Sequence, residues 1–202
     1  MGGSAGSRPS SRGQSVKWMW RILGALSALA VICVSGLWLY GLRPGHGRNS
    51  ATVEINRPAA DVWRYMTTDE LTKKWVSGLE EIRHMTPGVT GAGEKLHLVE
   101  SYEGERYPME MTIERVNAPR ELAFLIVSVG DPSNSFTERG SYQLEERDGK
   151  TRVTLSAQTD YHGFLPRLME PIITKQADAK LAGDLARLKE LAEAEPPLTR
   201  PN

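Results

Sequence analysis

An uncharged run over residues 22–42 constrains this chain more than any other part of its sequence. The run is 21 residues long. At about 1.5 Å per residue, a helix of that length spans about 31 Å, which matches the hydrocarbon core of a bilayer. Amphipathic aromatic rings, which prefer the headgroup region, occur near both ends of the run. These rings belong to Trp18, Trp20, Trp38 and Tyr40. We therefore predict a single transmembrane helix over residues 17–42.

A cleaved signal peptide is the alternative interpretation of this segment. The apolar region of a signal peptide usually has about 7–15 residues, which is shorter than this run. Within the run, an A-x-A cleavage pattern occurs at Ala28-Leu29-Ala30, and cleavage there would leave an apolar new terminus. A lipoprotein-type cut before Cys33 would follow the bulky Ile32. We therefore expect an uncleaved anchor.

The charges are distributed unevenly along the chain. Residues 1–50 carry six bases and no acid, so all 25 acids lie in residues 51–202, against 19 bases. Four of the six bases precede the apolar run, and the positive-inside rule then favours a cytoplasmic N-terminus with the C-terminal domain outside, periplasmic or extracellular. An acidic domain is poorly suited to nucleic acid, so we predict no nucleic-acid partner. The single cysteine, Cys33, excludes an intramolecular disulfide.

The remaining sequence divides into one domain and its flanks. Residues 1–16 are rich in Gly, Ser and Arg and predict a disordered tail. Residues 43–50 predict a short flexible linker, and residues 51–195 predict one soluble α+β domain. Residues 196–202 follow the last helical pattern and predict a second disordered tail.

Alternating residues and turn signals predict seven antiparallel strands within the domain. They cover residues 51–56, 79–85, 94–102, 109–116, 122–129, 136–146 and 151–161. Asp148-Gly149 predicts a tight hairpin in which both central residues need a positive φ. Two short helices are predicted near residues 58–66 and 69–75. A long amphipathic helix is predicted over 164–194, and it is the one element long enough to cover a curved sheet.

Three segments give the chain a resemblance to a known superfamily. They are the opening VEINRPAADVW (53–63), the turn Asn117–Leu122, and the hairpin around Tyr142–Thr154. With the closing helix they resemble the START/Bet v 1-like (SRPBCC) superfamily, especially its polyketide cyclase/dehydrase-like members, over about residues 51–193. The resemblance implies a helix-grip fold, in which the sheet surrounds the long helix around an apolar cavity. It also implies ligands such as lipids, sterols, quinones or polyketides, with enzymes in the minority.

The residue patterns do not indicate a metal site or a cofactor. His97 and Glu100 have H-x-x-E spacing, but residues three apart on a strand face opposite sides of the sheet. Asp160 and His162 share a face near a strand end, where a surface pair is the ordinary interpretation. Residues 51–202 contain no G-x-S-x-G elbow, and Cys33 lies in the apolar run. We predict no metal, no cofactor and no nucleophilic catalysis.

General acid–base catalysis remains possible because one predicted strand carries an inward-facing carboxyl. In residues 136–144 the apolar members of one alternating set indicate that Glu138 faces inward, where desolvation raises the pKa of a carboxyl. Glu138 and Tyr161 are therefore weak catalytic candidates. Glu138 could transfer a proton or anchor a polar part of a ligand, or it could be a rim carboxylate that pairs with an arginine or with water.

The same alternation predicts the residues that surround a cavity between the sheet and the C-terminal helix. They are Trp75, Leu96, Leu98, Met109, Met111, Phe124, Phe136, Glu138, Tyr142, Tyr161, Leu168 and Ile172. The alternative is that these side chains simply pack together.

Three functions remain open at this point. The first is membrane-anchored binding of a hydrophobic small molecule, such as a lipid, isoprenoid or quinone. The second is a polyketide cyclase or aromatase-type enzyme that uses an inward acid or base. The third is a non-catalytic interaction module, which a completely filled core would favour. The sequence names no protein partner.

Overall fold

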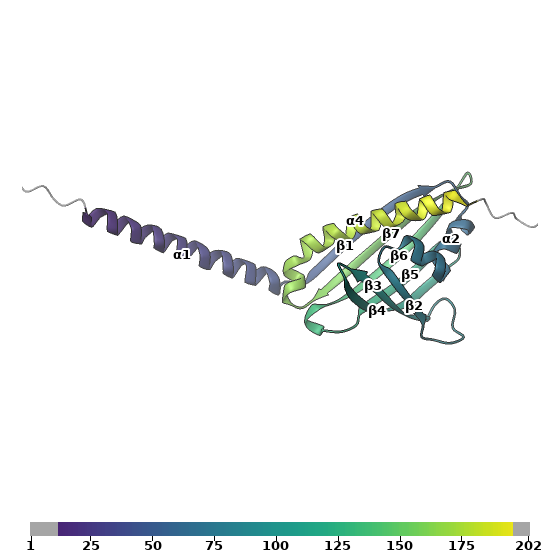
Figure 1. The fold of residues 1–202 in the computed structure, drawn as a ribbon, viewed down its shortest axis with the longest axis horizontal. Coiled ribbons are helices and arrows are strands. Elements are labelled where there is room, and N and C mark those ends of the chain that lie inside the picture. The colour runs from purple at the N-terminus through teal and green to yellow at the C-terminus, as the bar shows by residue number, and fades with distance from the viewer. Residues whose placement is uncertain (1–11, 196–202) are drawn as a thin grey trace, which may run out of the picture. The chain divides into compact units, whose positions relative to one another are not determined.

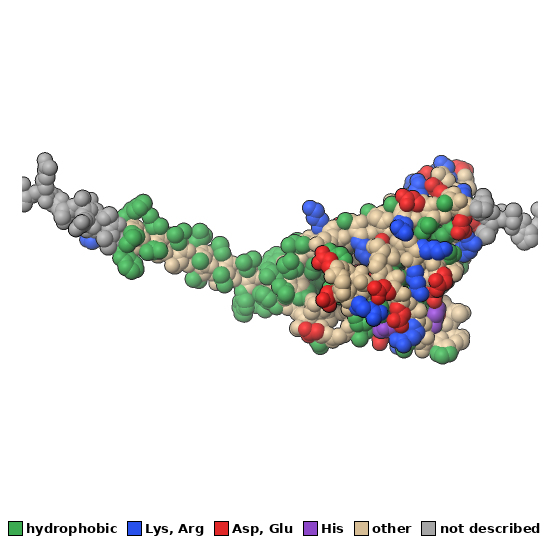
Figure 2. Space-filling view, viewed as in Figure 1, with side chains coloured by type: hydrophobic (Ala, Val, Ile, Leu, Met, Phe, Trp, Pro, Cys, Tyr) green, Lys and Arg blue, Asp and Glu red, His purple; other side chains and the backbone are tan. Residues whose placement is uncertain are grey.

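A computed structural model describes residues 12–195. The chain divides into two compact units, and the boundary between them in the sequence lies between Leu42 and Arg43. In the first unit, α1 (Arg12–Leu42) is a continuous helix. The segment Lys17–Leu42 contains a stretch with a mean hydropathy of 2.3, and none of that stretch is buried. α1 is therefore long and apolar enough to cross a membrane. Figure 2 shows this helix covered in hydrophobic side chains.

The predicted tails are only partly described by the structure. Residues 12–16 were expected to belong to a disordered tail, but their backbone is helical and continues α1 toward the N-terminus. Residues 1–11 and 196–202 lie outside the described residues.

The second unit is an α+β domain that contains every strand and helix predicted after residue 50. Its elements are, in chain order, β1 (Gly45–Ile55), α2 (Ala59–Thr67), α3 (Asp69–Trp75), β2 (Leu79–His84), β3 (Lys95–Tyr102), β4 (Glu105–Asn117), β5 (Glu121–Ser128), η1 (Pro132–Asn134), β6 (Ser135–Arg147), β7 (Lys150–His162) and α4 (Phe164–Ala194).

The strands form one antiparallel sheet in the order β1-β7-β6-β5-β4-β3-β2. The consecutive strands β1 and β2 therefore lie at opposite edges, and α2 and α3 carry the chain from one edge to the other. Figure 1 shows α4 lying along β1 on one face of this sheet. The predicted helix-grip fold, a curved antiparallel sheet of about seven strands with a long C-terminal helix, is confirmed.

Two tight hairpins follow from local turn chemistry. Asp148 and Gly149 have φ angles of 52° and 73°, as predicted for the β6–β7 connection. Glu103 and Gly104, between β3 and β4, have φ angles of 51° and 85°. Turns with two positive φ angles match the right-handed twist of paired strands, so each hairpin holds its register.

The predicted flexible linker over residues 43–50 is wrong, because β1 begins at Gly45 and pairs with β7 from its first residue. The glycines that suggested flexibility have a packing role instead. A Cβ atom at Gly47 would lie 3.0 Å from the ring of Tyr161 and 3.1 Å from the Thr174 hydroxyl. A side chain at Gly45 would likewise contact Arg167 at 3.0 Å. Bare backbone at these positions lets α4 approach the sheet edge closely.

Polar and apolar contacts then hold α4 in place. The side-chain amide of Asn49, which is buried, donates to the Thr174 carbonyl at 2.9 Å and to the Asp178 carboxylate at 2.7 Å. Further along, Leu185 and Leu188 are fully buried in the same core cluster as Ile55 and Val153. The C-terminal half of α4 therefore closes the main hydrophobic core.

A second glycine contact organises the middle of the sheet. Gly140 on β6 pairs with Phe124 on β5, and a Cβ atom at Gly140 would lie 2.5 Å from the Phe124 ring. The far end of the ring thus lies against the backbone of β6 and fills space that a side chain would otherwise take.

We predict that Gly140→Ala lowers the free energy of unfolding by about 1–3 kcal/mol, because an added methyl group overpacks the core against Phe124. Urea unfolding of the full chain in detergent measures the change. Gly183→Ala is the control, since a Cβ atom there meets nothing within 4 Å. Alanine in that helix should stabilise by about 0.5–1 kcal/mol. Equal stabilities for the two variants would contradict this account of the packing.

Candidate functional site

A cavity of about 370 Å³ lies between the two short helices and the inner face of the sheet. Its size falls within the range of about 300–1,000 Å³ that is typical of small-molecule sites. Its wall is mostly apolar and comes from α2, α3, the strands β2 to β6 and the loop between β2 and β3. The apolar wall residues include Trp63, Met66, Trp75, Val76, Leu79, Ile82, Leu96, Leu98, Met111, Ile113, Val116, Leu122, Phe124 and Ile126.

The predicted position of the cavity, between the sheet and the C-terminal helix, is corrected by the structure. Within residues 12–195, no lining residue comes from α4. The helix lies over β1, where Gly45 and Gly47 admit it, so the space under α2 and α3 is the part of the sheet that stays unfilled. Leu168 and Ile172, both on α4, therefore lie away from the cavity, and Ile172 is exposed.

The structure brings half of the predicted cavity residues together. Six lie in the wall: Trp75, Leu96, Leu98, Met111, Phe124 and Tyr142. Met109 is buried on β4 but is not part of the wall. Phe136, Glu138 and Tyr161 lie on the β6–β7 ladder, where Phe136 pairs with Tyr161 and Glu138 pairs with Thr159.

Aromatic residues give one side of the cavity a fixed shape. The Trp75 indole donates to the Tyr65 carbonyl at 2.9 Å, which fixes the orientation of the ring. Tyr142 meets Trp75 edge-on, with ring centroids 6.1 Å apart, and meets Phe124 at 5.7 Å. Such edge and tilted geometries are favourable beyond simple burial. This wall is therefore preformed.

A polar cluster interrupts the apolar wall at Glu100. The Lys180 ammonium lies 3.5 Å from the Glu100 carboxylate and 3.0 Å from that of Asp184. The other oxygen of Asp184 accepts a hydrogen bond from the Ser77 backbone N–H at 2.9 Å. Strand β3, helix α4 and the segment after α3 thus meet at one lysine.

Burial controls the protonation of this cluster. It raises the pKa of Glu100, and the nearby Asp184 charge adds to the rise while Lys180 opposes it. Burial alone would lower the pKa of Lys180, but the two carboxylates outweigh it and raise that pKa. Burial also raises the pKa of Tyr142. A neutral Glu100 would present an O–H donor to the cavity.

Glu138 lies beside this cluster, in a similar environment. Its carboxyl accepts a hydrogen bond from the Thr159 hydroxyl at 2.7 Å. Burial raises the pKa of Glu138, although the Thr159 bond partly opposes the rise. Burial likewise raises the pKa of Tyr161, the other weak catalytic candidate. Neither residue contributes to the wall of the cavity.

Sequence reasoning missed Glu100, Lys180 and Asp184 as members of a site. The spacing of these three residues in the sequence does indicate that they face inward. Glu100 follows Leu96 and Leu98 at period two, so it shares their inward face. Asp184 interrupts the apolar stripe of α4 between Leu181 and Leu185, and Lys180 precedes Asp184 by four residues.

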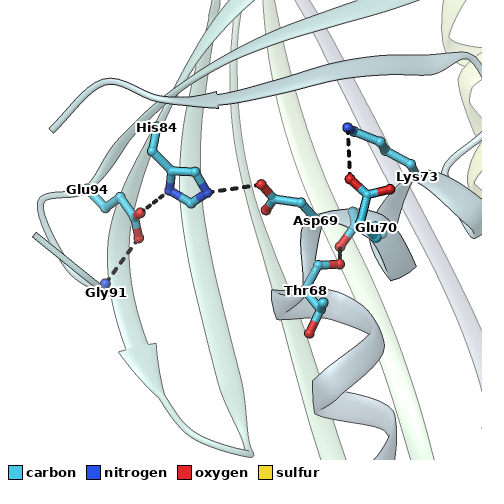
Figure 3. Close-up of polar contacts among 8 residues, drawn as sticks. Thr68, Asp69, Glu70, Lys73, His84, Gly91 and Glu94 are labelled. Atoms are coloured by element: carbon cyan, nitrogen blue, oxygen red, sulfur yellow. Dashed lines mark hydrogen bonds and ion pairs between the residues drawn. The ribbon is translucent and has the colours of Figure 1, made fainter. Parts of the chain in front are cut away.

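His84 bridges two carboxylates where the cavity reaches solvent (Figure 3). Its Nδ1 lies 2.6 Å from Glu94 and its Nε2 lies 3.1 Å from Asp69. The other oxygen of Glu94 accepts from the Gly91 backbone N–H at 3.2 Å. His84 lines the cavity, yet its side chain is 52% exposed. The three side chains thus join β2, the β2–β3 loop and α3 across one opening.

Protonation of His84 favours this bridge. The hydrogen bond to Glu94 raises the pKa of His84 most, and the bond to Asp69 adds to it, while burial opposes both. Only the imidazolium can donate from both ring nitrogens at once. Among the described residues, no group of three or more His, Cys, Asp or Glu side chains is arranged to hold a metal ion.

A second hollow lies on the opposite, outer face of the sheet. It has a volume of about 640 Å³ and a wide opening, and charged side chains line much of it. Arg139 pairs there with Glu114 at 3.1 Å, and Arg115 pairs with Glu121 at 2.6 Å. Its paired charges suit water rather than an apolar ligand, so the inner cavity is the better candidate site.

We predict that the bridge at His84 makes stability depend on pH. Because the folded pKa is raised, the stabilisation is fully present below the unfolded value of about 6.5 and is lost as the pH rises through the folded pKa. The melting temperature of the wild type should therefore exceed that of His84→Gln by more at about pH 6 than at about pH 9. Glu70→Gln removes a carboxylate that pairs with Lys73 and should show no such trend. A constant difference between wild type and His84→Gln would refute the bridge.

We also predict that Glu138→Gln stabilises the protein at neutral pH. A folded pKa above the unfolded one means that ionisation costs stability once the pH rises above about 4.3, and glutamine removes that cost. The glutamine carbonyl can still accept from Thr159. Thermal unfolding should show the gain at neutral pH and its disappearance near pH 4. Glu145→Gln, exposed on the same strand, should change little. A less stable Glu138→Gln variant at neutral pH would overturn the assignment.

Comparison with known families gives one match over most of the domain. A family model described as "Polyketide cyclase / dehydrase and lipid transport" matches residues 47–193. The match begins within β1 and ends at the close of α4, so it includes the cavity, the Glu100 cluster and His84. No curated protein matches the sequence.

Solved structures share the fold at low identity. Ara h 8.0201 has a TM-score of 0.59 at 15% identity, over 75% of this chain and 100% of its own. A conserved protein from Geobacillus kaustophilus has a TM-score of 0.61 at 12% identity, over 73% and 94%. The di-domain ARO/CYC BexL from the BE-7585A biosynthetic pathway has a TM-score of 0.59 at 16% identity, over 89% of this chain and 61% of its own. At these identities the likeness shows the fold alone.

Proposed function

Because the chain belongs to the polyketide cyclase/dehydrase and lipid transport family, we propose that it binds a hydrophobic small molecule in the inner cavity while α1 anchors it in a membrane. The predicted superfamily resemblance is confirmed by the same match. The family supports hydrophobic-ligand binding or a cyclase-like role, and the cavity supports binding as the first function.

The single observation that carries the proposal is the apolar cavity of about 370 Å³ under α2 and α3. A cavity lined by side chains such as Leu96, Met111 and Ile126 gains free energy when an apolar ligand replaces poorly satisfied water. A scaffold that only bound other proteins would have no need to leave this volume unfilled. The cavity therefore supports a binder over a non-catalytic interaction module.

The polar cluster suggests what part of the ligand is recognised. Glu100 is a partly buried carboxyl in the wall, and burial raises its pKa. In its protonated form it would donate a hydrogen bond to a ligand. A ligand with an apolar body and one carbonyl or hydroxyl oxygen would satisfy this donor. Quinone-like molecules, isoprenoid alcohols and polyketides have that chemistry.

The anchor places the domain where such molecules dissolve. Molecules with large apolar bodies partition into bilayers, so a tethered domain meets them at high local concentration. Four bases precede the apolar run, and this favours a cytoplasmic N-terminus with the domain on the other side. The proposed protein is thus a single-pass membrane protein that holds an apolar molecule at the membrane surface.

A cyclase or aromatase-type enzyme is the second candidate function. The observation that favours it is again Glu100, a carboxyl with a raised pKa that faces the cavity and has Lys180 beside it. Such a group can give a proton to a carbonyl oxygen and take it back. Glu138 would act only through this cluster, because it does not line the cavity.

We predict that a photoreactive diazirine fatty acid labels the cavity in the full chain reconstituted in vesicles. After irradiation, mass spectrometry should find labelled peptides from β3 to β5. Leu96→Trp should remove most of this labelling, because the indole fills the cavity next to Met111. Lys95→Trp adds the same ring on the exposed face of the same strand and should leave the labelling unchanged.

Peptides from α1 provide an internal control, because a membrane-inserted helix is labelled by probe dissolved in the bilayer. Labelled α1 with unlabelled β3 to β5 would count against the binding function but leave the anchor standing. Equal labelling of β3 to β5 in wild type and Leu96→Trp would mean that the probe lies outside the cavity.

A further inference from the structure

Four large apolar side chains lie exposed on the first turns of α4. The exposed fractions are 40% for Phe164, 63% for Leu165, 37% for Met169 and 52% for Ile172. Figure 2 shows hydrophobic side chains gathered over this part of the helix. We call Phe164, Leu165, Met169 and Ile172 the α4 apolar patch. Nothing in the cavity or the core uses these side chains, since the core residues of α4 come later, at Leu185 and Leu188.

The patch has the periodicity of a surface that lies against an apolar phase. Leu165, Met169 and Ile172 are spaced by four and three residues, so they form one stripe along the helix. From Leu165 to Ile172 the stripe is about 10 Å long at 1.5 Å per residue. It ends where Lys175 and Gln176 begin a polar, exposed surface. A contiguous apolar surface of this kind marks an interaction site rather than ordinary exposure.

Chain connectivity indicates what the patch meets. Two residues separate the end of α1 at Leu42 from the start of β1 at Gly45. Three Cα–Cα steps of 3.8 Å allow at most about 11 Å between Leu42 and Gly45. Gly45 pairs with Tyr161, and the patch begins three residues after Tyr161. If α1 crosses a bilayer, this end of the domain has to lie at the surface of that bilayer.

The charges around the patch are compatible with lipid headgroups. In residues 164–175 the sequence has a single acid, Glu170. Its carboxylate accepts a short hydrogen bond from Arg43, at 2.6 Å. Arg167 and Lys175 add two positive charges on the same turns, and such charges favour anionic lipid surfaces. No unpaired acid on these turns would repel the headgroups.

We propose that the α4 apolar patch inserts into the interfacial region of the membrane that α1 crosses, so that the domain has a second attachment point and a fixed orientation. The inference rests on the membrane anchor of the proposed function but not on ligand binding. An amphipathic helix that docks in this way buries its apolar face about 5–10 Å into the headgroup boundary. The bilayer therefore covers side chains that are exposed when the domain is considered by itself.

Spin labelling of the full chain in phosphatidylcholine and phosphatidylglycerol vesicles tests the proposal. A nitroxide is attached at Leu165→Cys or Ile172→Cys in a Cys33→Ser background. Val89→Cys is the control, because Val89 is 39% exposed on the β2–β3 loop, at the opposite end of the strands. The measurement compares collisions with oxygen, which dissolves in lipid, and with a nickel chelate, which stays in water.

Labels at residues 165 and 172 should favour oxygen over nickel several-fold more than the label at residue 89. Equal nickel accessibility at all three positions would overturn the proposal. Dipolar broadening that grows with the protein-to-lipid ratio would also overturn it, because a second copy of the chain would then cover the patch. The native Cys33, labelled in the wild type, reports whether α1 is inserted, so failure of the anchor is distinguished from failure of the docking.

Discussion

The close approach of α4 to β1 is the contact on which the rest of the domain depends. It requires backbone without side chains at Gly45 and Gly47, and the buried amide of Asn49 then fixes the helix by two hydrogen bonds. Because α4 occupies one edge of the sheet, it leaves the strands from β2 to β6 without a long helix over them. The two short helices cover that region incompletely, and the cavity is the space that remains.

The same arrangement explains why ionisable groups are buried beside an apolar cavity. The Lys180 side chain reaches from α4 to β3, where its ammonium lies near both Glu100 and Asp184. One lysine faces two carboxylates there, and the Glu100 charge also adds to the rise in the pKa of Glu138, which comes mainly from burial. Full ionisation of all the acids would leave excess negative charge in a region of low polarity. Burial raises the pKa of Glu100 and of Glu138, and a carboxyl that takes up a proton there becomes a hydrogen-bond donor.

Much of the fold was predictable because its signals are local. The alternation of strands, the positive-φ turn at Asp148-Gly149 and the limits of the closing helix at Phe164 and Ala194 all follow from residues close together in the sequence. The prediction of a flexible linker over residues 43–50 is wrong for an equally physical reason. Glycines in residues 43–50 indicate freedom when they are considered alone, and they indicate close packing only when the partner helix, more than a hundred residues later, is known.

The candidate site was predictable only in part. Inward-facing residues on the sheet follow from period two, which is why Leu96, Leu98, Met111, Phe124 and Tyr142 lie in the cavity wall as predicted. Which part of the sheet remains uncovered depends on where α4 crosses it, and no local pattern determines that crossing. Leu168 and Ile172 belong to the predicted wall because the sequence predicts that the long helix covers the sheet and closes the cavity.

The pairing of β1 with β7 has a consequence for how the chain is made. Ribosomes deliver α1 and β1 first, but the strand that pairs with β1 is synthesised about a hundred residues later. With synthesis at about 5–20 residues per second, β1 waits for several seconds without its partner. Under the proposed function, α1 is thus available for insertion well before the sheet can close. A membrane-anchored chain would then be made in a fixed order, with α1 inserted first and the domain folded last.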